Sequence, residues 1–255
     1  MPKLSVVIIT FNEEKLIGKC IDSVLNIADE IIVLDSFSTD KTVEIARSKG
    51  AIVKEARFAG YVEQKNLAVQ MASNDYVLSL DADEMLDATL IAAIAEEKKS
   101  FTHQAYVMNR CTNYCGKFIR HGLWYPDRKL RLFDKRIAHW GGVNPHDKVE
   151  VADAVPVKRL RGDILHFSYN TIEEHVAQGN KFSTIAAQSL LERGKKPGWI
   201  KVFVNPVWTF IVGYILRRGM LDGAAGLTIS ILSAHHTFLK YIKLYWLHRK
   251  AGKRN

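Results

Sequence analysis

The chain has 255 residues, 47 % of them hydrophobic and 25 % charged, which is ordinary globular composition and excludes a disordered tail or a fibrous repeat. Its net charge of +9 is compatible with a nucleic acid, a membrane surface or an anionic ligand as partner. Residues 1–109 carry a net charge of −6, residues 110–161 carry +7 and residues 190–255 carry +10. Because the N-terminal part is acidic and the chain has no nucleic-acid-binding motif, we expect no nucleic-acid partner.

The first 100 residues alternate apolar runs typical of strands with patterns typical of helices. The predicted strands are Leu4–Thr10, Glu30–Asp35, Ala51–Lys54 and Asp75–Leu80, and the predicted helices are Glu14–Leu25, Asp40–Lys49, Tyr61–Met71 and Asp87–Lys98. Such alternation predicts an α/β fold, with a Rossmann-like, mostly parallel sheet flanked by helices.

The rest of the chain has two different patterns. Residues 104–168 contain short strand-like pieces separated by Gly, Pro and Asn, which predicts antiparallel or mixed sheet. Residues 171–193 and 199–250 have helical patterns, the second broken near Pro206 and around 219–226. We therefore predict two parts: residues 1–168 as the α/β domain and residues 169–255 as a helical C-terminal extension.

No targeting or membrane-spanning segment is expected. The N-terminal apolar run is short and is followed at once by Asn12 and Glu13, so it is not a signal peptide. The apolar runs Val202–Leu216 and Gly223–Leu239 fall short of the about 18 residues that a spanning helix needs. With three cysteines and no disulfide pattern, a cytoplasmic location is the default expectation.

Polar side chains follow the predicted parallel strands, where ligands of such sheets bind. Asn12 and Glu13 follow the first strand, Asp35 ends the second, and Asp81 and Asp83 follow the fourth. Residues i and i+2 of an extended segment project to the same side, so Asp81 and Asp83 suit a Mg²⁺ or Mn²⁺ ion with substrate phosphates. The alternative is a pair of solvated carboxylates before the next helix.

Two further patterns bear on the chemistry. The glycine patterns of dinucleotide-binding folds and P-loops are absent, which argues against those sites. The segment Gly141–Val149 contains His146 and Asp147, and a carboxylate in a loop over the strand ends is a candidate general base. Pairing of Asp147 with Lys148 or Arg131 is an equally good explanation of that carboxylate.

Together these segments resemble the signature series of family 2 glycosyltransferases, which have the GT-A fold. The matching stretches have the right order and spacing; they are residues 5–14 (SVVIITFNEE), 32–42 (IVLDSFSTDKT), 65–66 (KN) and 80–84 (LDADE). Later segments are similar to bacterial lipopolysaccharide core β-1,4-glucosyltransferases that act on inner-core heptose; they are residues 128–133 (RKLRLF), 141–149 and 217–223 (RRGMLDG).

The resemblance implies a role for each matching position. Asp83 would hold the metal ion, and Asp147 would be the catalytic base, with Glu84 and Asp127 in reserve. The residues implied to bind the nucleotide sugar are Thr10, Asn12, Glu13, Asp35, Ser38, Lys65 and Asp81. The charge of the basic middle segment makes it a candidate acceptor site, through Arg128, Arg131 and His146, since arginine suits bidentate contacts with phosphate or carboxylate groups. The alternative is scattered surface charge.

The implied activity is a metal-dependent, inverting transfer of one sugar, glucose from UDP-glucose, to a lipopolysaccharide inner-core heptose. The Gln-x-x-Arg-Trp motif of processive members is absent, so we expect no polymer synthesis. The alternatives are another nucleotide sugar, a lipid-linked acceptor, or a protein that binds nucleotide sugars without catalysis.

The basic C-terminal quarter suggests where the protein acts. Its cationic residues alternate with aromatic ones, a combination that favours a helical anchor at a membrane interface. We therefore expect a peripheral protein on the inner face of the bacterial inner membrane. The alternative is that the C-terminal helices pack internally or form a homo-oligomer.

Overall fold

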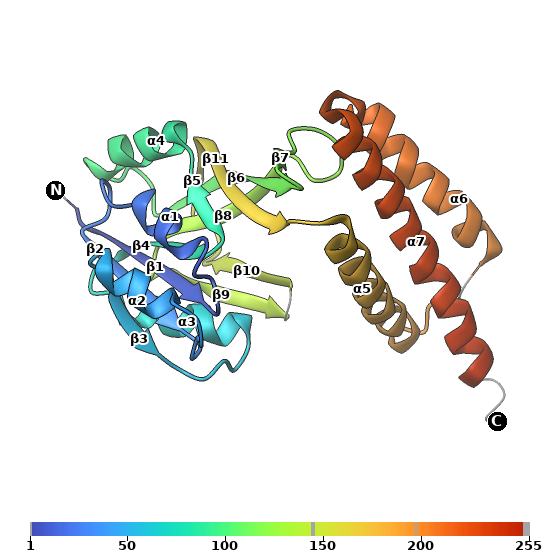
Figure 1. Cartoon of the computed structure of the whole chain (residues 1–255), viewed down its shortest axis with the longest axis horizontal. Coiled ribbons are helices and arrows are strands. Elements are labelled where there is room, and N and C mark those ends of the chain that lie inside the picture. Colours follow the sequence, from blue (N-terminus) through green and yellow to red (C-terminus); the bar gives the residue numbers. More distant parts are fainter. Residues whose placement is uncertain (1, 144–145, 197, 252–255) are drawn as a thin grey trace. The chain divides into compact units, whose positions relative to one another are not determined.

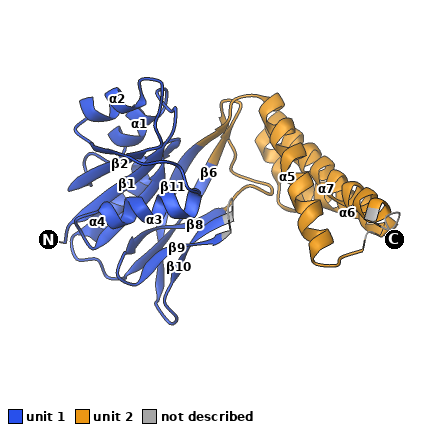
Figure 2. Cartoon of the chain, turned by 90° about the horizontal axis from the view of Figure 1, so that it is seen from below, with its two compact units in different colours: residues 1–111, 127–166 blue, residues 112–126, 167–255 orange. Residues whose placement is uncertain are grey.

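The computed structural model describes residues 2–143, 146–196 and 198–251. It divides into two compact units, coloured separately in Figure 2. The first unit comprises residues 1–111 and 127–166, and the second comprises residues 112–126 and 167–255. The predicted boundary at residue 168 differs from this division in two respects, because residues 167–168 and the segment 112–126 both lie in the helical unit. The short loops and strands of that segment carry no helical pattern that would have revealed it.

A twisted sheet forms the first unit (Figure 1). Its strand order is β3-β2-β1-β4-β8-β6-β11-β5. The strands β1, β2, β3 and β4 pair in parallel and are Leu4–Thr10, Glu30–Asp35, Ile52–Glu55 and Tyr76–Asp81. The strand β8 then runs antiparallel to β4. The predicted α/β fold is therefore confirmed.

The central strand β1 is buried on both faces, which explains its unbroken apolar sequence. Leu4, Val6 and Ile8 pack in one core cluster, and Val7 packs in a second cluster. Successive side chains of a strand point to opposite faces, so the two clusters lie on opposite sides of the sheet. The helices that cover these faces in sequence order are α1 (Ile17–Asp22), α2 (Thr42–Ser48), α3 (Tyr61–Met71) and α4 (Ala88–Lys98).

The antiparallel part contains more strands than the sequence pattern indicated. The described strands are β5 (Glu84–Leu86), β6 (Ala105–Tyr114), β7 (Lys117–Phe118), β8 (Asp127–Asp134), β9 (Ala138–Val143), β10 (His146–Val151) and β11 (Val157–Tyr169). The strands β9 and β10 form a separate antiparallel hairpin in which Asp147 pairs with Gly142. The strand β5 was missed because it has only three residues, and it pairs with β11 rather than with a neighbour in sequence.

The second unit is mainly helical. Its elements are α5 (Ile172–Glu192), α6 (Trp199–Phe210), the π-helix η1 (Ile211–Leu216), the 3₁₀-helix η2 (Gly219–Asp222) and α7 (Gly223–Ala251). A capping box starts α5, because Thr171 accepts from the backbone N–H of Glu174 and Glu174 accepts from that of Thr171.

The predicted break near Pro206 does not occur. The helix continues from Trp199 through Pro206 to Leu216 and ends before Arg218, whose φ of 58° is left-handed. Pro206 has no backbone N–H and so cannot donate the usual hydrogen bond to the residue four positions earlier, yet it lies inside the helix. Among the described residues, Trp199–Leu216 is the one helix whose 18 residues are long and apolar enough to cross a membrane, by length and composition only. The sequence estimate was too short because it began at Val202.

The segment 112–126 is held within the second unit by a buried carboxylate. Asp222 accepts hydrogen bonds from the backbone N–H groups of Arg120 (3.1 Å) and His121 (2.8 Å). Lys117 Nζ donates to the backbone carbonyl of the same aspartate, at 2.6 Å. The 217–223 motif therefore organises this segment through Asp222.

Candidate active site

The loops that follow β1 and β2 are tied to each other at the carboxyl edge of the sheet. Asn12 donates its backbone N–H to Ser38 Oγ (2.8 Å), and its side-chain oxygen accepts from the backbone N–H of Thr39 (2.8 Å). Asn12 has a φ of 53°, a left-handed conformation that asparagine tolerates better than most residues. These contacts fasten the two loops to each other at this edge of the sheet.

Asp35 is fully buried at the end of β2, beside Thr10 in the strand register. It accepts from the backbone N–H of Ser38 (2.7 Å) and from Ser38 Oγ. Thr10 is also buried, and its hydroxyl oxygen has no partner among the described residues. The predicted nucleotide residues Thr10, Asn12, Asp35 and Ser38 are thus brought together at one edge.

Glu13, at the same edge, is close enough to Asp83 for the two carboxylates to influence each other. Burial raises the pKa of Glu13, and the nearby carboxylates of Asp83 and Asp40 raise it further. Asp83 itself lies 3.2 Å from a histidine, measured from its Oδ2 to Nε2 of His166. The strand β11 carries His166, which pairs with Glu84 of β5 in the sheet register. The tertiary fold therefore places a histidine side chain beside Asp83, the carboxylate predicted to hold the metal ion.

Lys65 lies between the two carboxylates that the sequence placed far apart. Its Nζ is 3.0 Å from Asp81 Oδ1 and 2.7 Å from Asp147 Oδ2. The lysine is only 3 % exposed, and its amine also lies 4.4 Å from the centre of the Trp140 ring. Asp147 thus pairs with Lys65, which neither reading of the sequence had considered.

Arg131 forms a second buried charge cluster beside the first. Its Nη2 donates to Glu84 Oε1 (2.9 Å) and Asp81 Oδ2 (3.2 Å). Burial disfavours the charged form of Asp81 and so raises its pKa. The positive charges of Lys65 and Arg131 have the larger opposite effect and hold the pKa of Asp81 well below its ordinary value. Asp81 is therefore an anion in the folded chain.

The hairpin that carries Asp147 is fastened to α3 next to Lys65. Asn66 Nδ2 donates to the backbone carbonyl of Trp140 (2.8 Å), and the Trp140 N–H donates back to Asn66 Oδ1 (2.9 Å). The Trp140 ring nitrogen also donates to Ser79 Oγ, at 3.2 Å. These bonds fix the β9–β10 hairpin over the end of β4, and they give Asn66 a structural role beside Lys65.

A cavity of about 470 Å³ opens at this cluster, and all its lining residues belong to the first unit. Six of them are cationic and two are carboxylates, so the lining has an excess of positive charge. The charged lining residues are Lys65, Asp81, Arg110, Arg128, Lys129, Arg131, Asp147 and Lys148. Such a cavity suits an anionic ligand.

The predicted acceptor residues occupy different positions at this cavity. Arg128 is exposed and lines it, whereas Arg131 is 3 % exposed and is committed to Glu84 and Asp81. The side chain of His146 lies outside the described residues. The reserve bases are both engaged, because Glu84 is fully buried beside Arg131 and Asp127 pairs with Arg110 at 2.8 Å.

The pair Asp83 and His166 fits two neighbouring ligands of one divalent ion. Ligands about 2.1 Å from an ion and at right angles around it lie about 3 Å apart, close to the observed 3.2 Å. No cluster of three or more metal-binding side chains occurs in the described part of the chain. A Mg²⁺ ion bound together with a nucleotide usually takes one or two ligands from the protein and further oxygen ligands from the phosphates.

Sequence reasoning missed His166 and Trp140 as parts of this site. His166 lies 83 residues after Asp83 in the chain, on a strand that neighbours it only through β5. No spacing pattern links the two. Trp140 is 3 % exposed, the burial of a core residue. Its ring instead packs against Lys65 and Arg131.

Residues 5–155, more than half of the chain, match the profile of Glycosyl transferase family 2. The chain belongs to this family. A glycosyltransferase of Rickettsia bellii described as uncharacterized is 36 % identical over 253 residues, which cover 95 % of this chain and 86 % of that protein. The lipopolysaccharide core biosynthesis glycosyltransferase LpsC of Rhizobium meliloti is 29 % identical over 271 residues, covering 100 % and 97 %.

Solved structures include glucosyl-3-phosphoglycerate synthase from Mycobacterium tuberculosis in complex with Mn²⁺, UDP and glucosyl-3-phosphoglycerate. It is 26 % identical over 44 % of each chain, with a TM-score of 0.37. That likeness is too low to transfer details of its site to this chain.

Proposed function

We propose that this protein is a metal-dependent, inverting glycosyltransferase that moves one glucose from UDP-glucose to a lipopolysaccharide inner-core heptose. The observation that carries the proposal is the buried lysine that joins Asp81 of the parallel sheet to Asp147 of the hairpin. It brings a candidate base within reach of the nucleotide edge, in a cavity lined mainly by cations.

The donor would lie along the edge built by Asn12, Asp35 and Ser38. Asp35 and Ser38 supply acceptors and donors for a uracil ring, and the metal ion held by Asp83 and His166 would neutralise charge on the diphosphate. Lys65 Nζ lies within hydrogen-bond distance of both Asp81 and Asp147. When the donor binds, this ammonium group would turn from Asp147 to the oxygens of the diphosphate. That movement would release Asp147 from its ion pair.

The chemical step needs a base on the face of the sugar opposite the diphosphate. The acceptor hydroxyl oxygen attacks the anomeric carbon, the bond from that carbon to the diphosphate oxygen breaks, and Asp147 takes the hydroxyl proton. A single displacement inverts the anomeric configuration, so an α-linked donor sugar becomes β-linked.

The acceptor assignment rests on the cationic lining and on the similarity to LpsC. Arg128 is exposed at the cavity and can bind phosphate or carboxylate oxygens in bidentate fashion. The relative that covers the whole chain is named for lipopolysaccharide core biosynthesis. Nucleotide sugars are cytoplasmic metabolites, so the reaction would take place at the cytoplasmic face of the inner membrane.

Asp147→Asn tests the base directly. We expect kcat to fall about 10²- to 10⁴-fold, because Asn cannot accept the proton. UDP-glucose with Mn²⁺ should bind at least as tightly as to the wild type, because Lys65 no longer has to leave the charged Asp147. Asp153→Asn changes an exposed carboxylate near the same hairpin and should leave kcat unchanged. UDP release is measured at saturating donor and heptose acceptor, with and without EDTA.

Each of the other outcomes has a distinct meaning. Near-normal turnover by Asp147→Asn would show that Asp147 is not the base. Release from a different nucleotide sugar, or onto a lipid-linked acceptor alone, would replace the proposed substrates. UDP binding without release from any donor and acceptor pair would favour a binding protein.

A further inference from the structure

The second unit has a continuous apolar face along α6. Six apolar residues on one side of this helix are each more than half exposed: Trp199, Ile200, Phe203, Val204, Val207 and Trp208. Their spacing repeats every four residues in two adjacent rows, which is one side of an α-helix. The opposite side packs on α7 through Val202, which is 1 % exposed, and Thr209, whose hydroxyl is 3.4 Å from that of Thr237.

The apolar face continues beyond α6 to the turn before α7. Ile215, Leu216, Met220 and Leu221 are each about half exposed or more. Gly213 instead lies on the packed side, where an added Cβ would meet Leu123 at 3.0 Å. Soluble monomers rarely expose an apolar surface that extends over this many side chains, so this one has an occupant.

Charge indicates what that occupant is. Between Glu192 and Asp222 the chain has no acidic residue. It has six cationic residues in this interval, gathered toward the two ends of the face: Arg193, Lys195, Lys196, Lys201, Arg217 and Arg218. If a second copy covered the face in this segment, cations would meet cations and repel. A surface of anionic lipid complements both the charge and the apolar side chains.

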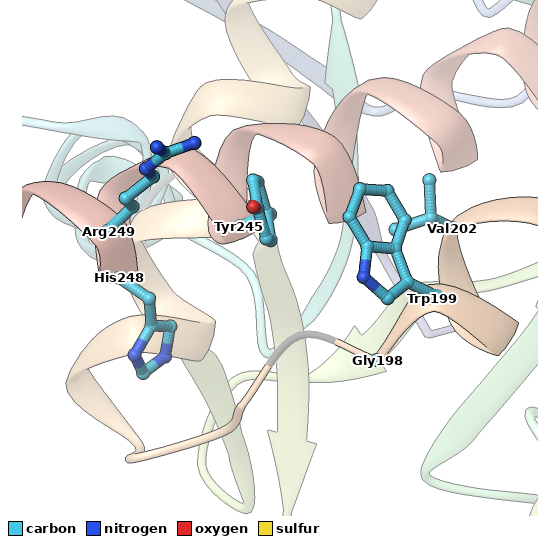
Figure 3. Close-up of a pocket in the computed structure, with 6 residues that line it drawn as sticks. All are labelled: Gly198, Trp199, Val202, Tyr245, His248 and Arg249. Carbon is cyan, nitrogen blue, oxygen red and sulfur yellow. The ribbon is translucent and has the colours of Figure 1, made fainter.

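The N-terminal end of the face has an interfacial composition. There α6 and α7 enclose a pocket of about 420 Å³, lined by Gly198, Trp199, Val202, Tyr245, His248 and Arg249. Figure 3 shows Trp199 facing Tyr245 across it, and their ring centres are 4.9 Å apart. Aromatic rings beside arginine are typical of the level where lipid headgroups meet acyl chains.

We propose that the face formed by α6, η1 and η2 inserts into the headgroup region of an anionic bilayer, with the helix lying in the membrane plane. This inference does not rest on the proposed transferase reaction, because it concerns lipid binding without any sugar nucleotide. It accounts for why a helix long enough to span is only 11 % buried.

The packing of α6 favours an in-plane position over a spanning one. The helices α6 and α7 are antiparallel neighbours, since Trp199 contacts Tyr245 and Thr209 contacts Thr237. Lys243 of α7 in turn donates to α5, at Asn180 and Ser183. A spanning α6 would draw the charged residues of these partner helices into hydrocarbon, where charged side chains are unfavourable.

The test measures binding of the full chain to vesicles, without donor or acceptor. We expect sedimentation with vesicles of equal phosphatidylcholine and phosphatidylglycerol, much weaker binding to phosphatidylcholine alone, and weakening by salt. The triple variant Ile200→Gln, Phe203→Gln, Val207→Gln should bind at least about tenfold more weakly, because three apolar side chains no longer insert. Circular dichroism checks that the variant is folded.

A matched triple variant provides the control. Leu25→Gln, Ile52→Gln and Val157→Gln replace three apolar residues of the first unit that are each nearly half exposed, and this variant should bind vesicles as the wild type does. Equal binding by the two triple variants, or no vesicle binding by the wild type, would overturn the proposal.

Two further readouts separate the competing occupants. Alkaline carbonate should strip the wild type from vesicles, and full retention would show a spanning helix and overturn the in-plane position. Light scattering should show that the wild type and the α6 triple variant have the same mass. A wild-type dimer that becomes monomeric in the variant would show instead that a second copy covers the face.

Discussion

The candidate chemistry depends on a few charged side chains at one edge of the sheet, in which negative and positive charges alternate. Asp147, Lys65, Asp81 and Arg131 form a chain of ion pairs in which each carboxylate contacts at least one cation. Removing one member would leave a partner buried and unpaired, which costs more than the pair contributes. The four side chains are therefore charged and hold one another in place in the absence of a ligand.

The proposed metal ligands can be tested by substitution at the residue scale. His166→Ala and Asp83→Asn should each weaken Mn²⁺ binding at least about tenfold, because each would remove one of the two proposed protein ligands. Thermal shift with UDP and Mn²⁺, with and without EDTA, measures the effect. His139→Ala changes an exposed histidine of the same unit and serves as control. A full metal-dependent shift in His166→Ala would exclude it as a ligand.

A buried histidine of the second unit predicts a pH dependence of stability. Burial lowers the pKa of His175 to about 4. The ring lies 3.2 Å from the Tyr114 hydroxyl and among the rings of Trp124 and Tyr169. Its unfolded pKa is about 6.5. Between these values the unfolded chain binds a proton that the folded chain does not, so stability falls as pH decreases.

The expected size of that effect is about 3 kcal/mol of unfolding free energy, lost from pH 6.5 down to about 4. Urea unfolding across this range measures it. The variant His175→Gln should lose this share of the pH dependence, whereas His139→Gln should keep the wild-type curve. An unchanged curve for His175→Gln would show that the ring has the same pKa in the folded and the unfolded chain.

At the scale of elements, close approach of backbones positions the helices of the second unit. An added Cβ at Gly226 of α7 would lie 1.9 Å from the carbonyl oxygen of Gly219 in η2. The glycine at this position is therefore required by the tight turn into α7. Gly179, in α5, has open space around the same position.

These two glycines predict substitutions of opposite sign. Gly226→Ala should lower the free energy of unfolding by about 3 kcal/mol, because the backbone of η2 must move. Gly179→Ala should raise it by about 1 kcal/mol, because alanine favours the helix and meets no neighbour. Urea denaturation followed by circular dichroism compares the two. Equal effects of both substitutions would show that the close approach is not present.

At the scale of the whole molecule, charge and chemistry divide between the two units. Every residue described at the candidate donor edge and cavity belongs to the first unit, and the exposed apolar face belongs to the second. The overall charge of +9 therefore describes neither part. In our proposals, the acidic N-terminal part binds a metal ion and a nucleotide, and the basic part binds lipid.

This division predicts local protection by ligand. UDP with Mn²⁺ should slow hydrogen exchange in peptides from β1, β2 and α3, because a ligand stabilises the structure that binds it. Peptides from α6 and α7 should exchange at the same rate with and without ligand. Mass spectrometry reads both in one experiment, and equal protection of α7 would contradict the division.

Patterns local in the chain were predictable from the sequence. The strands Leu4–Thr10 and Glu30–Asp35 and the helix Tyr61–Met71 have the bounds that their apolar periodicity predicted. The strand-end position of Asp35, Asp81 and Asp83 followed as well, because parallel strands end at one edge. The roles of these residues stay a prediction, although the family is shown.

Only the tertiary structure decided which distant residues meet. The contact of Lys65 with Asp147 joins residues 82 positions apart, and that of Asp83 with His166 joins residues 83 apart. The order of strands and the pinning of the hairpin by Asn66 set both contacts, and neither leaves a periodic signal in the sequence. The same reason explains α6: composition showed apolar and basic residues, but packing on α7 determined which side remained exposed.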